Sequence, residues 1–64
     1  MGMGDRVRFY RRVRRMSQRQ LAGSVRMAPE QLNRYEMNRV RPTLPTARRL
    51  ARALRVTLSD LLVE

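Results

Sequence analysis

The chain has 64 residues, which is room for one small domain and too little buried volume for an elaborate enclosed active site. All 15 basic residues are arginine and they outnumber five acidic residues, so the formal net charge of +10 indicates a polyanionic partner, either nucleic acid or an acidic membrane surface. Without cysteine or histidine the chain has no disulfides and no ordinary zinc ligands, so neither a metal nor a cofactor is expected.

The N-terminal third predicts a short lead-in followed by a helix. Residues 1–4 (MGMG) are expected to be flexible, and the helix is expected to start near Gly4 or Asp5 and to end near Arg15. One apolar side combines Val7, Tyr10 and the stem of Arg14, and a narrower one combines Phe9 and Val13.

Residues 16–36, MSQRQLAGSVRMAPEQLNRYE, predict two short amphipathic helices in close succession. Ser17 and Gln20 have the spacing of a capping box at the start of the first of them. Pro29 suits the first position of the second, where no N–H partner is needed, although Ala28 before it is not a usual cap. In this second helix Leu32, Tyr35 and Glu36 face inward, and Glu30, Asn33 and Arg34 face outward.

The rest of the chain predicts two more helices. Asn38 is a good left-handed helix stop, and residues 39–45 have the composition of a loop. A helix is expected from about Pro45 to Leu54, and a last short helix is expected after a cap at Thr57. No strand pattern is present, so we expect an all-α fold of five short helices around one core.

The stretch from Gly4 to Leu62 resembles the phage repressor and Cro-like helix-turn-helix family. MSQRQLA is similar to the opening of that family's scaffold helix, and LARALRVTLSDLL is similar to its ending. Leu32, Tyr35 and Glu36 match the apolar pair and the glutamate of its recognition helix. The resemblance implies a single lambda-repressor-like DNA-binding domain over residues 1–64, in which the second and third helices form the helix-turn-helix.

This chain departs from the family pattern at several positions. The family often has glycine where Arg26, Asn38 and Arg55 stand here. Ala28 and Pro29 occupy positions where polar side chains of the family often touch bases. A proline offers only apolar contact to a thymine methyl group, so the family's base preference does not carry over through Pro29.

The third helix carries the side chains expected to read bases. Phosphates need only positive charge or donors, whereas base edges in the major groove need amides, acids and arginine forks. The candidates for base reading are Pro29, Glu30, Gln31, Asn33 and Arg34. The alternative is a solvated helix face with an internal Glu30–Arg34 salt bridge.

Candidates for phosphate contact surround this helix. They are Gln18, Arg19, Arg26, Arg39 and Arg41, and each arginine among them could instead be an ordinary surface charge. The arginines of the fourth helix are expected to serve solubility and long-range attraction.

Two further sets of residues are expected to be structural. The resemblance implies that Arg11 and Glu36 form an ion pair between the first and third helices, without a catalytic role. Leu58, Leu61, Leu62 and Val63 are many apolar residues for one short helix, so some are candidates for a dimer interface and the alternative is that all belong to the core. Phe9 and Val13 form a second candidate patch.

Together these features predict a cytoplasmic, sequence-specific transcriptional regulator of the repressor type. Its partners would be double-stranded DNA with a palindromic operator and a second copy of the chain, with no membrane and no small-molecule cofactor. An antitoxin or controller that also binds a protein, and a nonspecific nucleic-acid-binding domain, remain as alternatives. An enzyme is disfavoured because no histidine, cysteine or paired acids are available.

Overall fold

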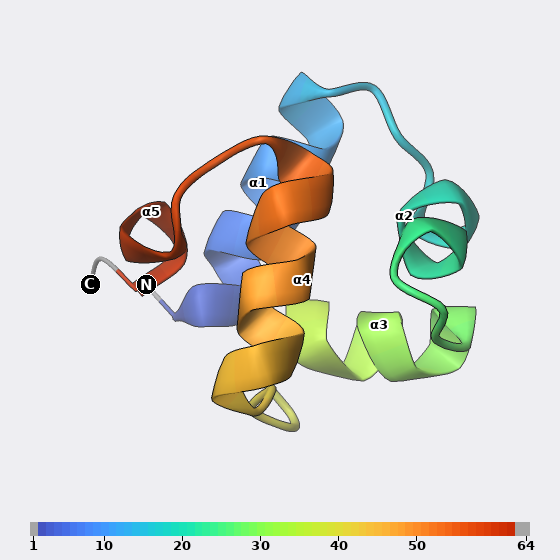
Figure 1. Ribbon diagram of the computed structural model, residues 1–64. Helices are drawn as coiled ribbons and strands as arrows, with labels where there is room; N and C mark the ends of the chain where they lie inside the picture. The colour runs from blue at the N-terminus through green and yellow to red at the C-terminus, as the bar shows by residue number, and fades with distance from the viewer. Residues whose placement is uncertain (1, 63–64) are drawn as a thin grey trace.

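The computed structural model describes residues 2–62, and every regular element within them is a helix (Figure 1). The helices are α1 (Met3–Val13), α2 (Gln18–Ser24), α3 (Pro29–Glu36), α4 (Leu44–Leu54) and α5 (Leu58–Leu62). The prediction of an all-α fold with five short helices is therefore confirmed.

Two of the helices start at the caps that the sequence predicts. At α2, the hydroxyl of Ser17 accepts from the N–H of Gln20 at 3.0 Å, and the Gln20 side chain accepts from the N–H of Ser17 at 2.8 Å. At α5, Thr57 and Asp60 exchange the same two bonds at 3.1 and 2.9 Å. Each pair satisfies two N–H groups that the first helical turn leaves without partners.

The first helix starts earlier than expected. The N–H of Gly2 donates to the Asp5 carboxylate at 2.9 Å, and α1 already includes Met3 and Gly4. Gly4 is buried, and its N–H donates to the side-chain oxygen of Asn38 at 3.0 Å. The prediction of a flexible lead-in is therefore wrong for residues 2–4, because contacts with the end of α3 hold them; Met1 lies outside the described residues.

Two other helix boundaries differ from the prediction. α1 ends at Val13 rather than near Arg15. α4 starts at Leu44, one residue early, because the Thr43 hydroxyl supplies the cap by accepting from the N–H of Thr46 at 3.4 Å. Pro45 then takes the second helical position, where an N–H would have no helical partner.

Left-handed residues end the first four helices, and within residues 2–62 none of them is glycine. They are Arg15 (φ 57°), Arg26 (φ 58°), Asn38 (φ 59°) and Arg55 (φ 59°). The predicted helix stop at Asn38 is thus present. A left-handed conformation costs an ordinary residue about 1–2 kcal/mol, so the three arginines hold a strained backbone that tight packing of short helices must offset.

Apolar side chains from all five helices form one core. Its buried members are Val7, Leu21, Ala22, Val25, Leu32, Tyr35, Leu50, Ala51, Leu54 and Leu61. Arg14 does not belong to it, contrary to the prediction: the residue is exposed, and its Nε–H donates to the carbonyl of Leu54 at 2.9 Å. The favourable interaction of a cation with a helix C-terminus explains this placement.

The helices are arranged so that α2 and α3 share one side of the molecule. α3 packs on α1 and α2, and α4 packs on α1, α2 and α5. In Figure 1, α3 runs roughly horizontally at the lower right, below α2, and α4 stands upright in front of α1. Over residues 2–62, none of the helices combines the length and apolarity that crossing a membrane requires.

Candidate nucleic-acid interface

α3 presents two chemically different faces because its apolar residues recur at helical spacing. Leu32, Tyr35 and Glu36 are buried against the rest of the fold. Glu30, Asn33 and Arg34 are exposed, and Gln31 is half-buried. Ala28 provides no side-chain cap, and Pro29 occupies the first turn as predicted. One side of this helix therefore anchors it, and the other offers an acid, two amides and a guanidinium.

A surface depression, here called the α3 hollow, collects most of the predicted contact residues. Its lining residues are Gln18, Pro29, Glu30, Asn33, Arg34 and Arg39. Four of the five candidates for base reading thus meet two candidates for phosphate contact. The fifth base-reading candidate, Gln31, lies beside Arg34 and accepts from its guanidinium at 3.3 Å.

The alternative of a helix face closed by its own salt bridge does not match the geometry. Within residues 2–62 the ion pairs are Arg8–Asp5 and Arg11–Glu36, and Glu30 takes part in neither. In the part of the chain that the structure describes, the Glu30 carboxylate and most of the donors of Arg34 therefore remain available to an external partner.

A hydrogen-bond network fixes α3 against the two helices that precede it. Glu36 is 1% exposed, and its carboxylate accepts from the Arg11 Nε–H at 2.7 Å and from a second Arg11 N–H at 3.0 Å. The predicted pair is therefore present. Arg11 also donates to the carbonyl of Met16 at 2.8 Å, which ties the turn before α2 to the same guanidinium.

Gln18 extends this network to the α3 hollow. Its side-chain amide donates to Glu36 at 3.2 Å and to the Oδ1 atom of Asn33 at 3.0 Å. This bond orients the Asn33 amide. A carbonyl oxygen has two lone pairs, so Oδ1 keeps one acceptor position, and the Asn33 NH₂ group keeps its donors.

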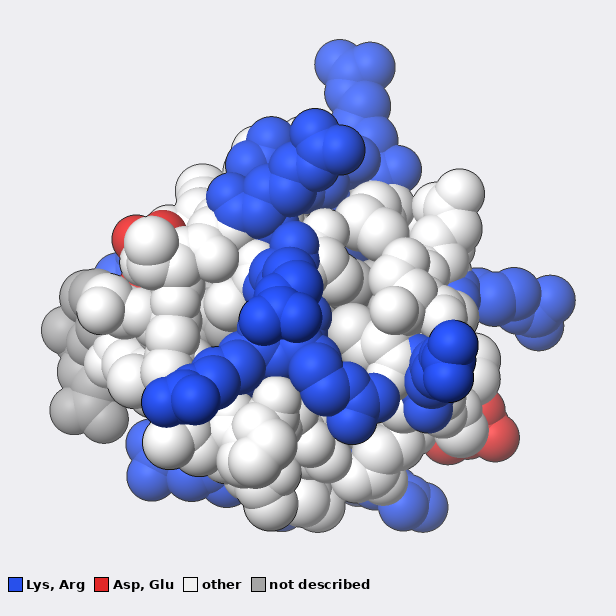
Figure 2. Space-filling view, in the orientation of Figure 1, with Lys and Arg blue, Asp and Glu red and all other residues white. Residues whose placement is uncertain are grey.

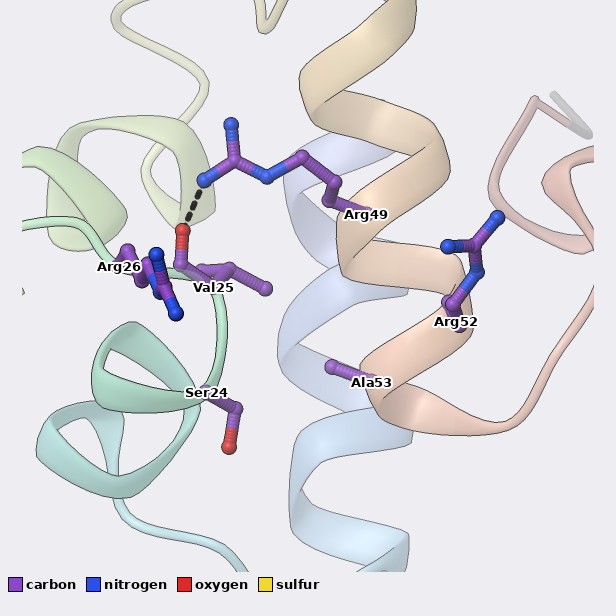
Figure 3. A pocket seen from close by; sticks show the side chains of 6 residues that line it. All are labelled: Ser24, Val25, Arg26, Arg49, Arg52 and Ala53. Carbon is purple, nitrogen blue, oxygen red and sulfur yellow. Dashed lines mark hydrogen bonds between the residues drawn. The ribbon is translucent and has the colours of Figure 1, made fainter.

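The remaining predicted phosphate contacts are spread over the surface. Arg19 is exposed near the start of α2, and Arg41 lies in the loop between α3 and α4, beside the buried Pro42. Arg26 lies elsewhere, at the far end of α2, where it lines a separate hollow with Arg49 and Arg52 (Figure 3). The structure thus does not bring Arg26 together with the α3 hollow.

Two arginine contacts that hold helix ends could not be predicted from the sequence. Arg49 donates to the carbonyl of Val25 at the end of α2 (Figure 3), and Arg8 donates to the carbonyl of Glu36 at 3.3 Å. Both join residues far apart in the chain, so local spacing could not reveal them.

Fewer residues are available for the expected dimer interface than the sequence suggested. Leu61 is 0% exposed, so it belongs to the core, and its assignment to an interface was wrong. Leu58 is half-buried, Leu62 is 46% exposed, and Val63 lies outside the described residues. Phe9 and Val13 are each 57% exposed and leave the second candidate patch open to solvent.

Comparison with known proteins identifies the family of the chain. Residues 7–61, which include all of α2, α3 and α4, match a family model described as helix-turn-helix. No curated protein matches the chain.

Proposed function

Because the chain belongs to the phage repressor and Cro-like helix-turn-helix family, a family of DNA-binding regulators, we propose that it reads a specific DNA sequence by inserting α3 into the major groove. The observation that carries this proposal is the α3 hollow, where free amide, acid and guanidinium groups meet on one exposed helix face. We further propose that the regulatory outcome is repression, with the chain occupying an operator.

The side chains of α3 have complementary partners on base edges. Arg34 forks onto the O6 and N7 atoms of guanine, and Asn33 pairs with adenine N6 and N7. Glu30 accepts from a cytosine amino group, Gln31 supplements Arg34, and Pro29 offers apolar contact to a thymine methyl group. The bond from Gln18 holds Asn33 in place before DNA arrives, which lowers the entropic cost of binding.

Phosphate contacts set the position of α3 in the groove. Arg39 borders the α3 hollow, and the exposed Arg19 and Arg41 are the further candidates, from the start of α2 and from the loop after α3. Gln18, whose side chain is engaged by Asn33 and Glu36, offers its backbone N–H at the start of α2. These groups bind any DNA sequence alike.

A homodimer on a palindromic operator is the second element of the proposal. The exposed Leu62 and the half-buried Leu58 lie on the short last helix and supply apolar surface for a two-fold contact. Such a dimer would place two copies of α3 about 34 Å apart, one turn of B-DNA.

A controller-type module that binds DNA together with a protein partner is the competing candidate. The observation in its favour is the exposure of Phe9 and Val13 on α1, away from the α3 hollow. In that case a partner would cover this patch while α3 still contacted DNA.

The test is selection of random duplex DNA by the purified chain at near-physiological salt, followed by sequencing. Enrichment of an inverted repeat with half-site centres about 10 bp apart would support a dimeric operator-binding protein. Enrichment of a single half-site would support base reading by a monomer and contradict the dimer. Binding without enrichment, with affinity that collapses as salt rises, would contradict sequence-specific recognition.

A further inference from the structure

The outer surface of α4 carries positive charge that no acid among residues 2–62 neutralises in an ion pair. Its exposed basic residues are Arg48, Arg49, Arg52 and Arg55. Figure 2 shows arginine side chains gathered over α4, with acidic atoms only at the edges of this face. We call these four residues together with Arg26 the arginine surface.

The spacing of these arginines is unfavourable for the isolated fold. Arg48 and Arg52 are four residues apart and Arg49 and Arg52 are three apart, so like charges are neighbours on α4, and Arg55 adds a further charge just after its end. Each such pair costs a few tenths of a kcal/mol. Among the described acids, Asp5 and Glu36 are paired with other arginines, Asp60 caps α5, and Glu30 lies in the α3 hollow. A polyanion would relieve this repulsion.

The arginine surface surrounds a depression, the α4 hollow, between the end of α2 and α4 (Figure 3). Ser24, Val25, Arg26, Arg49, Arg52 and Ala53 line it. One N–H of Arg49 donates to the carbonyl of Val25, which holds that guanidinium over the hollow with its other donors free. Arg26 reaches the same hollow from a left-handed backbone position, φ 58°.

The α4 hollow is separate from the α3 hollow. The two share no lining residue. Gln18 is the first residue of α2 and Ser24 is the last, about 9 Å away along the helix axis, so the two hollows lie at opposite ends of that helix. A duplex seated on α3 thus uses the end of α2 away from the arginine surface.

The chemistry of the α4 hollow favours a phosphate backbone over an acidic protein. Guanidinium groups bind phosphate oxygens through paired N–H donors. Protein interfaces rely on buried aromatic or aliphatic anchors. None of the exposed large apolar residues among residues 2–62 lines this hollow. The lining also lacks the amides and acids that base reading requires.

We propose that the arginine surface is a second, sequence-independent DNA site, so that one chain bound to its operator through α3 can hold the phosphate backbone of another duplex. The proposal rests on the proposed function for the first duplex. It adds a bridging activity, which α3 alone does not supply.

The experiment is a two-duplex capture. A duplex carrying the sequence enriched by selection is attached to beads, the full chain is added at about 100 mM salt, and a labelled duplex of unrelated sequence is supplied. The wild-type chain should retain the labelled duplex. The double variant Arg26→Asn/Arg52→Gln should retain at least about tenfold less, because two phosphate contacts are lost. Asparagine is chosen at position 26 because it tolerates a left-handed backbone.

The matched control variant also removes two positive charges, but it removes them from α1 and from the turn that follows α1. Arg12→Gln/Arg15→Asn also replaces one left-handed arginine by asparagine, and neither residue lines the α4 hollow. It should retain the labelled duplex within about twofold of wild type. Fluorescence anisotropy with the operator duplex alone should give the same affinity for all three proteins, which separates this site from α3.

The outcomes are distinct. Operator binding without retention of a second duplex by the wild type would overturn the bridging proposal and leave the proposed function intact. Equal retention by both double variants would overturn it as well. Retention of labelled polyglutamate in preference to the second duplex would overturn it in favour of an acidic protein partner. Failure to bind the operator duplex at all would instead contradict the proposed function.

Discussion

Arg11 and Glu36 form a buried ion pair that joins the first helix to the last turn of α3. Arg11 donates two hydrogen bonds of 2.7 and 3.0 Å to the Glu36 carboxylate, and Glu36 is 1% exposed. Gln18 completes the set by donating to the same carboxylate at 3.2 Å. The position of α3 therefore depends on a buried acid that Gln18 links to the base-reading candidate Asn33.

Replacing this acid should strongly destabilise the fold. Glu36→Ala leaves the Arg11 guanidinium without its partner, and losses of about 3–5 kcal/mol are typical when one member of a buried pair is removed. A chain of this size has a total stability of only roughly 3–10 kcal/mol at about 0.05–0.15 kcal/mol per residue. Urea unfolding followed by circular dichroism measures the change. Glu30→Ala, which removes an exposed acid from the same helix, should cost less than about 1 kcal/mol. A Glu36→Ala curve that overlays wild type would refute the structural role.

Gly4 and Gly23 should respond oppositely to alanine. A Cβ atom at Gly4 would overlap the carbonyl oxygen of Tyr35 and lie 2.9 Å from that of Glu36, so the contact between α1 and α3 must open. We expect a loss of about 1–3 kcal/mol. At Gly23 a Cβ atom meets nothing within 4 Å, so Gly23→Ala should stabilise α2 by about 0.5–1 kcal/mol. Thermal unfolding of both variants measures the difference. Equal shifts in the same direction would contradict the close approach at Gly4.

Arg15 and Arg12 provide a similar contrast for the backbone. Arg15 is left-handed with φ 57°, so Arg15→Gly removes a conformational cost of about 1–2 kcal/mol. Glycine loses more conformational entropy on folding than arginine, which offsets part of this gain. We expect a net gain of about 0.5–1 kcal/mol. Arg12→Gly, inside α1, should instead lose about 1 kcal/mol. Urea midpoints that move in the same direction for both variants would contradict the left-handed assignment at Arg15.

The helix caps and helix stops could be predicted from the spacing of neighbouring residues, whereas contacts between distant parts of the chain could not. The Ser17 cap, Pro29 in the first turn and the Asn38 stop all depend on residues within a few positions of each other, and each is present. Arg14 was misplaced because its partner is the end of α4, which lies forty residues away.

The candidate site shows the same division. The outward face of α3 could be predicted from helical spacing, because its inward apolar residues fix which side faces out. The association of Arg26 with α4 instead of α3 could not, since it depends on how α2 packs against α4. Leu61 was uncertain for a related reason: a five-residue helix is too short for its pattern to separate core from surface.

Asp5 should make the start of α1 sensitive to acid. The backbone N–H of Gly2 is the largest influence and, with Asn38 and Arg8, holds the pKa of Asp5 below its ordinary value of 3.8, while desolvation opposes this. Because the folded-state pKa is lowered, the carboxylate stabilises the fold fully at pH values above 3.8, and this contribution disappears as the pH falls through the folded-state pKa.

Two measurements check this prediction. NMR titration of the Asp5 carboxyl should give a midpoint below 3.8. The stability difference between wild type and Asp5→Asn should be present at pH 6 and should disappear as the pH falls through the folded-state pKa. A midpoint at or above 3.8 would show that the capping contacts do not hold the carboxylate.

The most direct test of base reading by α3 is to repeat the duplex selection with Arg34→Ala and compare its enriched sequence with that of the wild type. Arg39→Ala serves as the control, since a phosphate contact should weaken binding to all sequences alike and lower the salt slope by about 1. If Arg34 forks onto a guanine, its variant should lose about 1–3 kcal/mol of discrimination at one base-pair position in each half-site and keep the others. An enriched sequence identical to that of the wild type, with affinity reduced uniformly, would contradict base reading by Arg34.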